Sequence, residues 1–162
     1  RWWKKDKKFD ELLRYRFLNI YYDAINSKLK SWRISEKGRL AEIIVIDQFS
    51  RNLFRDKPDA YYHDRLAIFL SKELIHLKLH QKLNKNEKIF TFMPFMHSEI
   101  FEDQIISLSL YSNLRIKENF RSALKHFNII RKFGRFPHRN KILNRTSTEE
   151  ELAFLTTPGS SF

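Results

Sequence analysis

The sequence predicts a fold made of α-helices alone, and three observations support this. Only three glycines and four prolines occur among the 162 residues, too few for the many tight turns of a β-sandwich. Apolar residues recur at spacings of three and four along most of the chain, as on the buried face of a helix. A chain of this length with 42% apolar residues buries roughly 70% of its unfolded surface, enough for one core. We therefore expect residues 1–162 to form a single all-α domain of about seven helices.

The first two helices are indicated by apolar spacing and by a capping residue. Apolar side chains at intervals of three and four predict a helix from Phe9 to Leu29. Ser35 is suited to cap a second helix that extends toward Phe54. Residues 43–46 are also compatible with a short buried strand. We favour the helix, because polar residues follow this segment with no turn residue between them.

Proline and asparagine mark the next two helices. Pro58 follows a break in the pattern and precedes a third helix over residues 62–77, since proline suits the first turn of a helix. Asn84 lies in the next turn and is followed by a short helix over residues 87–92. We expect this fourth helix to end at Pro94, because proline removes a hydrogen-bond donor from a helix interior.

The second half of the chain predicts three further helices. A fifth helix opens around His97 or Ser98 and extends to Tyr111. A sixth covers residues 118–132 and ends before Gly134, since glycine favours the residue that follows a helix.

A loop spans residues 135–145, and the last helix follows it. Two overlapping capping boxes, Ser147 with Glu150 and Thr148 with Glu151, indicate where the helix begins. Short connections of this kind make antiparallel helical hairpins the simplest packing. The sequence contains no clear internal repeat.

The formal net charge of +12 makes an anionic partner the first to consider. Residues 115–145 contain ten lysines and arginines against one acid, Glu118. The excess suits a solvated helix face or a nucleic-acid surface. The arginines are more specific, because a guanidinium matches the oxygens of a phosphate or carboxylate. Phe133 and Phe136, which alternate with basic residues, suit the core better than base stacking.

Several classes of protein are excluded by what the sequence lacks. The chain has no cysteine, which excludes disulfides, thiolate zinc sites, iron–sulfur clusters and cysteine nucleophiles and is compatible with the cytoplasm. No apolar stretch is long enough to cross a bilayer, so we expect no membrane partner and a cytoplasmic location. The absence of a glycine-rich loop argues against nucleotide-binding folds. The chain begins at Arg1 rather than Met, which is consistent with a missing N-terminal segment.

Three segments place polar side chains beside apolar helices: residues 47–52, 97–104 and 134–140. In these segments the chain resembles the bacterial family called Domain of Unknown Function 924. The matching motifs are Leu40-Ala41 with residues 47–52, residues 94–99, the octapeptide Phe-Gly-Arg-Phe-Pro-His-Arg-Asn at 133–140, Arg145, and residues 148–155. Family members carry a further aromatic segment before the counterpart of Trp2-Trp3. The resemblance extends over nearly the whole chain and implies an all-α fold similar to tetratricopeptide-like helical arrays. It implies no established reaction or cofactor.

We expect the three polar segments to converge on one cleft. The candidate catalytic residues are His97, Glu99 and His138, and the candidate ligand-binding residues are Asp47, Gln48, Arg51, Asn52, Asp103, Gln104, Arg135, Arg139 and Asn140. Glu99 and Asp103 are four residues apart and are expected to share a helix face. Together with His97 they could hold a divalent metal, but their spacing matches no recognised metalloenzyme motif, and we predict no metal site.

Four functions are compatible with such a cleft and with the basic span. The preferred one is the binding of an anionic small molecule. The second is an enzyme in which His97 or His138 exchanges a proton, with Glu99 as its partner. The third is nucleic-acid binding through residues 115–145, and the fourth, a peptide-binding array, rests on fold analogy alone.

A structural role for the same side chains is the competing interpretation. Asp47 and Glu99 would then accept hydrogen bonds from arginines and hold the long loop against the helices. We favour a site, because burying several charges only to fix a loop costs several kcal/mol of desolvation per ion. The sequence predicts neither a cofactor nor an oligomeric state.

Overall fold

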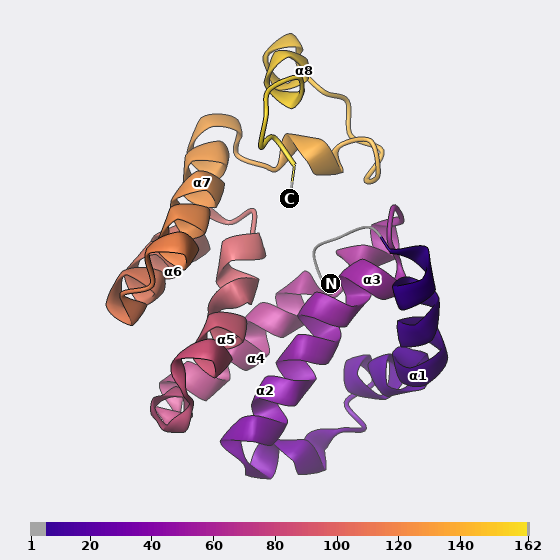
Figure 1. The fold of residues 1–162 in the computed structure, drawn as a ribbon, viewed down its shortest axis with the longest axis vertical. Coiled ribbons are helices and arrows are strands. Elements are labelled where there is room, and N and C mark those ends of the chain that lie inside the picture. The colour runs from indigo at the N-terminus through magenta and orange to yellow at the C-terminus, as the bar shows by residue number, and fades with distance from the viewer. Residues whose placement is uncertain (1–5, 162) are drawn as a thin grey trace.

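A computed structural model describes residues 6–161, which form helices and connecting turns with no strand in this range (Figure 1). The α-helices are α1 (Lys7–Ile25), α2 (Glu36–Ile44), α3 (Ser50–Leu53), α4 (Asp64–His76), α5 (Lys85–His97), α6 (Phe101–Leu114), α7 (Lys117–Phe133) and α8 (Glu149–Leu155). The shorter elements are the 3₁₀ turns η1 (Lys30–Ile34), η3 (Pro58–Ala60), η4 (Leu79–Lys82) and η5 (Pro137–Arg139) and the π-helical turn η2 (Val45–Phe49). The all-α prediction is confirmed. Trp2 and Trp3 lie outside the described residues.

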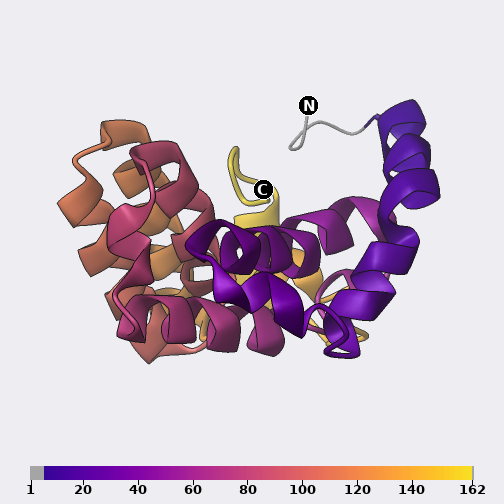
Figure 2. The same cartoon turned by 90° about the horizontal axis from the view of Figure 1, so that it is seen from below.

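Helices α4 to α7 pack in chain order, each against the next, whereas α1 packs on η2 and α3. Helices α2, α4 and α5 run side by side in the middle of the molecule, with α1 and α3 on one side and α6 and α7 on the other (Figure 1). In the view from below, the α1 side and the α6–α7 side of the molecule both extend upward, and the C-terminal segment lies between them (Figure 2). The arrangement leaves the ends of several elements facing a common central region.

Three groups of buried apolar side chains hold this arrangement together. The first lies among α1, α2 and α4 and includes Tyr21, Ile43 and Leu74. The second joins α5, α6 and α7, and the third packs the loop after α7 through Phe136. Fully burying an aliphatic or aromatic side chain contributes about 1.5–3 kcal/mol. The first two groups therefore supply most of the packing free energy, and the third fixes the position of the loop.

The second predicted helix is confirmed, including its cap. The Ser35 side chain accepts a hydrogen bond from the backbone N–H of Gly38 at 3.0 Å. Helical structure then continues without interruption through α2, η2 and α3, so the alternative of a strand at residues 43–46 is wrong. Within η2 the helix widens to a π turn, a feature often found at functional sites.

The predicted first helix is four residues too long, since α1 ends at Ile25. Two further predicted boundaries are wrong, and both concern α5. Pro94 lies inside this helix, which continues to His97. The residues around Pro94 are buried, and the Gln104 amide donates hydrogen bonds to the carbonyls of Phe95 and Met96 at 3.2 and 2.9 Å. Burial and these bonds to carbonyls of the last turn stabilise the end of the helix and so offset the energetic cost of proline in its interior. Helix α6 accordingly begins at Phe101, and His97 ends α5 instead of opening α6.

The ends of α7 and α8 follow the predicted signals. Gly134 ends α7 with a φ of 69°, a left-handed conformation that glycine adopts without a steric cost. The Thr148 and Glu151 capping box is present at the start of α8. The segment between them contains η5, which turns the chain back toward the centre of the molecule.

Substitution of Gly38 tests the contact between α2 and η1. Alanine is the better helix former by about 1 kcal/mol, but a Cβ at this position would overlap the carbonyl oxygen of Trp32 and lie 3.1 Å from the Ser35 hydroxyl. We expect Gly38→Ala to lower the free energy of unfolding by about 1–3 kcal/mol, as overpacking does, measured by urea denaturation. Gly134→Ala is the control, because nothing lies within 4 Å of its Cβ and only backbone strain remains. A Gly38→Ala protein as stable as wild type would contradict this packing.

Candidate functional site

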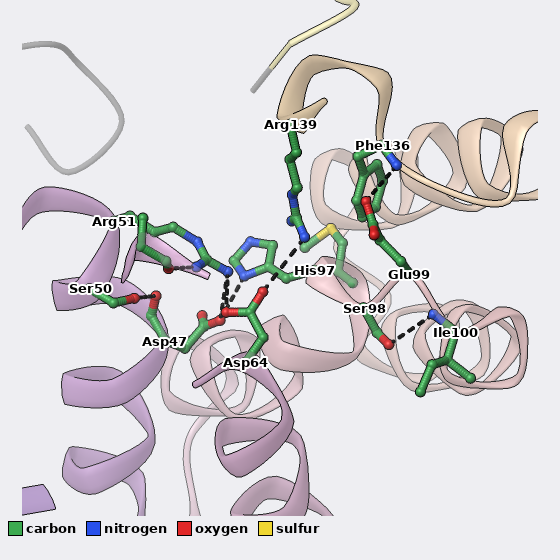
Figure 3. Close-up of polar contacts among 12 residues, drawn as sticks. Asp47, Ser50, Arg51, Asp64, His97, Ser98, Glu99, Ile100, Phe136 and Arg139 are labelled. Atoms are coloured by element: carbon green, nitrogen blue, oxygen red, sulfur yellow. Dashed lines mark hydrogen bonds and ion pairs between the residues drawn. The ribbon is translucent and has the colours of Figure 1, made fainter. Parts of the chain in front are cut away.

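Side chains from five elements meet in the central region. They are Asp47 from η2, Arg51 from α3, Asp64 from the first turn of α4, His97 from the end of α5 and Arg139 from η5 (Figure 3). The predicted convergence of the segments around residues 47–52, 97 and 139 is therefore observed. Asp64 was not among the predicted residues.

Asp47 is buried, with 1% of its surface exposed, and contacts His97. Its Oδ1 lies 2.8 Å from Nδ1 of His97, and the Gln48 amide donates to Oδ2. Burial opposes ionisation, but His97, Arg51 and the Gln48 bond lower the pKa of Asp47 to about 2. Asp47 is therefore a carboxylate at neutral pH and accepts the proton of His97 Nδ1. The second ring nitrogen, Nε2, is left available to a ligand or to water.

Arg51 and Arg139 share the carboxylate of Asp64. Arg51 Nη2 lies 2.8 Å from Oδ1, whereas Arg139 Nη1 lies 3.6 Å from Oδ2. Arg51 also donates to the carbonyl of Ala60 and lies 3.7 Å from Asp47. Burial raises the pKa of Asp64, and the two arginines oppose this effect. Arg51 therefore has a close ion pair and a backbone acceptor, although its Nη2 and Asp64 Oδ1 are not aligned for a hydrogen bond, and Arg139 has only the longer contact with the same carboxylate.

Arg139 is the least compensated cation of the group. Its residue is 5% exposed, and its side chain makes no hydrogen bond within residues 6–161; Nε is buried without a partner. The guanidinium lies 4.6 Å from the ring centroid of Tyr61 and 4.5 Å from that of Phe136, which fixes its orientation. Burial and the nearby Arg51 lower the pKa of Arg139 to about 10. It remains charged at neutral pH, with its N–H donors unused.

Glu99 holds the loop that follows α7. The prediction that Glu99 pairs with His97 is wrong. The Glu99 carboxylate accepts from Arg145 at 2.6 and 3.0 Å and from the Phe136 backbone N–H at 2.8 Å. Burial would raise the pKa of Glu99, but Arg145 and the Phe136 N–H lower it. The carboxylate beside His97 is instead Asp47. This difference follows from the helix boundary, because Glu99 lies in the turn after α5.

Asp103 and Gln104 are buried at the start of α6 and do not line the central region. Asp103 lies 2.7 Å from the Lys72 amine and accepts from the Ser98 hydroxyl at 2.8 Å. The predicted shared face of Glu99 and Asp103 is wrong, since only Asp103 belongs to the helix. Among the described residues, no group of three or more His, Asp or Glu side chains is arranged to hold a metal ion.

Arg135 and Asn140 are placed on the α8 side of the loop. Arg135 forms a two-pronged ion pair with the buried Glu151 at 2.7 and 2.8 Å. Asn140 donates to Glu151 at 3.2 Å and accepts from Arg145 at 3.0 Å. These contacts tie η5 to α8 and to the turn after α5, and they thereby fix the position of Arg139.

Two adjoining cavities lie against Arg139. The larger, of about 730 Å³, is lined by the predicted residues Gln48, Arg51, Asn52, His97, His138 and Arg139, together with Arg55 and His126. The smaller, of about 470 Å³, includes Glu99 and the apolar side chains Ile68, Ile100 and Leu143. Tyr61, His97 and Arg139 line both cavities and so form the wall between them.

Two further histidines of the larger cavity are neutral. His126 contacts the Ser122 carbonyl through Nδ1 at 2.8 Å, and a carbonyl only accepts, so Nδ1 carries the proton. Burial and the neighbouring His97, Arg139 and His138 lower the pKa of His126 to about 3. Burial and Arg139 likewise lower the pKa of His138 to about 4. Both rings therefore combine one N–H donor with one acceptor at neutral pH.

The sequence did not predict Asp64, Tyr61 or Arg55 as site residues, and it gave His126 no role in the site. Tyr61 and Asp64 lie in a segment without a recognisable motif, and aromatic residues are usually part of the core. His126 occupies the middle of an amphipathic helix, where its position on the inward face was the only available signal. Only the packing of α4 and α7 brings these side chains to the cavity.

The comparisons with known proteins agree with these motifs. A family model described as bacterial protein of unknown function (DUF924) matches residues 1–159. The chain belongs to the DUF924 family. It is similar to the solved structure of a protein of unknown function from Agrobacterium tumefaciens, with a TM-score of 0.91 and 34% sequence identity over 96% of this chain and 88% of that chain. No curated protein matches the DUF924 chain.

No helix within residues 6–161 combines the length and the apolar character that crossing a bilayer requires.

The buried neutral His126 predicts how the stability of this DUF924 protein depends on pH. In the unfolded chain a histidine takes up a proton near pH 6.5, whereas His126 in the folded state does so only near pH 3. Between these values the unfolded state binds more protons, so folding stability falls as the pH is lowered. His126 contributes up to about 1.4 kcal/mol of this loss for each pH unit.

We expect His126→Phe to flatten the dependence of the melting temperature on pH between about pH 6.5 and pH 4.5. The same change at the exposed His76 is the matched control. Scanning calorimetry across this range measures both variants. An equal slope in wild type and His126→Phe would show that His126 is not held neutral.

Proposed function

We propose that this protein binds a small organic anion, with a carboxylate or phosphate group, in the cavity of about 730 Å³. The observation that carries the proposal is Arg139, a buried guanidinium without a hydrogen bond within residues 6–161. Buried polar groups are normally hydrogen-bonded, and a buried charge without a close partner is costly. A bound anion would supply the missing acceptor.

The chemistry of Arg139 favours an anion over a neutral ligand. A guanidinium offers five N–H donors in a planar fork that matches carboxylate and phosphate oxygens. Tyr61 and Phe136 contact this group through their rings and supply no acceptor oxygen in these contacts. The donor capacity of Arg139 is therefore preserved while its orientation is fixed.

Other side chains that line the cavity suit the rest of an organic ligand. Gln48 and Asn52 add amides, and His126 and His138 are neutral at physiological pH. A neutral imidazole donates or accepts one hydrogen bond and adds no charge. Arg51 and Arg55 also line the cavity but are paired with Asp64 and Asp10, which leaves Arg139 as the cation best placed to anchor a ligand among polar side chains.

The basic span gives weaker support to a nucleic-acid partner. Its arginines divide into two groups. Arg135, Arg139 and Arg145 contact Glu151, Asp64 and Glu99, which belong to other elements. The remaining cations, such as Arg121 and Lys125, are exposed on α7. Exposed cations of this kind are common on solvated helix faces.

Arg139→Met separates binding from folding. An apolar substitute for a poorly paired buried cation is often neutral or stabilising, and Asp64 keeps its closer partner Arg51. We expect the ligand-free variant to melt close to the wild-type temperature. Wild type should be stabilised by inorganic phosphate or by succinate, by about 1.4 kcal/mol at ten times the dissociation constant. This corresponds to a rise of about 4 °C in melting temperature.

We expect Arg139→Met to abolish this rise, measured by scanning calorimetry and by isothermal titration. Arg121→Met removes the same charge from an exposed position of α7 and is the control. If neither anion stabilises wild type, or if Arg121→Met loses the effect to the same extent as Arg139→Met, the cavity is not the site of anion binding.

A further inference from the structure

The contact between His97 and Asp47 is not explained by anion binding alone. Asp47 is almost fully buried, whereas the His97 side chain is 18% exposed and lines both cavities. An ionised carboxylate placed behind a histidine fixes the tautomer of the ring and stabilises its protonated form. The structure thus presents an oriented imidazole nitrogen at the wall between the cavities.

We propose that His97 Nε2 is a proton acceptor that acts on the ligand held by Arg139, with Asp47 as its positioning residue. This inference rests on the proposed function, because it takes the anion as its substrate. The substrate class is an organic anion with an ionisable O–H or C–H bond near its anionic group.

The proton-transfer step balances without a further reactant. The lone pair of His97 Nε2 forms the new N–H bond, and the electron pair of the broken O–H or C–H bond stays on the ligand atom. The product is an imidazolium that is ion-paired to Asp47. The negative charge that develops on the ligand lies on the side of Arg139, whose unused N–H donors stabilise it.

The charges around His97 favour this direction of transfer once an anion is present. With His97 neutral, Arg51 and Arg139 balance the carboxylates of Asp47 and Asp64. An anion in the cavity adds negative charge to this balanced group, and the imidazolium that the transfer forms places a positive charge beside that anion.

The groups that face His97 belong to several elements. His126 from α7 lies with its ring centroid 6.3 Å away, and Arg139 and His138 belong to η5. His126 and His138 are held neutral by burial and by nearby positive charge, so they do not compete as bases at neutral pH. His97 differs from them in that its Nδ1 lies 2.8 Å from the buried carboxylate of Asp47.

The ligand-free protein provides the first test. Diethyl pyrocarbonate acylates an unprotonated imidazole nitrogen, and peptide mass spectrometry locates the modified histidine. We expect His97 to react in wild type, and Asp47→Asn to slow this reaction roughly tenfold or more, because an amide can donate to Nδ1 and shift the ring proton to Nε2. The exposed His76 should react equally in both proteins and is the internal control.

A second measurement does not depend on any variant. Nitrogen-15 NMR of histidine-labelled wild type reports which ring nitrogen carries the proton. We expect neutral His97 to be protonated at Nδ1 and bare at Nε2. The opposite tautomer, or an unreactive His97, would overturn the inference even if Asp47→Asn failed to fold.

Protection by an anion separates this inference from the proposed function. Phosphate or succinate should slow the acylation of His97 in wild type but not in Arg139→Met. A reactive, correctly protonated His97 that neither anion protects would overturn the placement of the ligand beside His97, and the proposed function as well if neither anion stabilises wild type. An unreactive His97 in a protein that binds the anions would overturn only the acid–base role.

Discussion

The arrangement of the central region depends on the contacts of the Arg51 guanidinium. This group contacts Asp47 one helical turn earlier, Asp64 at the start of α4, and the Ala60 carbonyl in the turn between them. The ring of Tyr61 lies 4.7 Å away and closes the remaining side. One side chain therefore joins η2, α3, η3 and α4. Without it, the ionised Asp47 would lose a neighbouring positive charge that helps to keep it charged while buried.

The loop after α7 shows how the same residue type takes two different roles. Arg135 and Arg145 each form two-pronged ion pairs, with Glu151 and Glu99, at distances of 2.6–3.0 Å. These pairs fix η5 at both of its ends. Arg139 lies between them, is held mainly by ring contacts, and keeps its donors free of hydrogen bonds within the described residues. The paired arginines fulfil the structural role that the competing interpretation expected, whereas Arg139 forms no such two-pronged pair within the described residues.

Much of the fold could be predicted from the sequence, because its helices carry local signals. Ser35, Gly134 and the Thr148 capping box each act within one helical turn, and all three are observed. The prediction was wrong at Pro94, where the local cost of proline is offset by burial and by Gln104, which lies on the next helix. A long-range contact of this kind leaves no periodic pattern.

The candidate site was predicted less completely for the same physical reason. The motif segments supplied His97, Arg51 and Arg139, but the carboxylate beside His97 was expected to be Glu99, two residues away in the chain. It is Asp47, fifty residues away, which reaches His97 only because α2 packs against α5. Asp64 is similarly remote from the loop whose arginine it contacts.

The charged groups of the central region are paired less closely than the ion pairs that hold the loop. A structural ion pair is stabilised by close contact between its two partners. Glu99–Arg145 and Arg135–Glu151 are each joined by two short hydrogen bonds. In the central group, the buried Arg139 and the largely buried Asp64 lie 3.6 Å apart, farther than the partners of either loop pair. Since desolvation of an unpaired guanidinium costs several kcal/mol, such looseness is a cost to folding that a bound anion would offset. The same cavity wall carries His97, so the residue that would hold the anion and the residue that would exchange a proton with it are placed side by side.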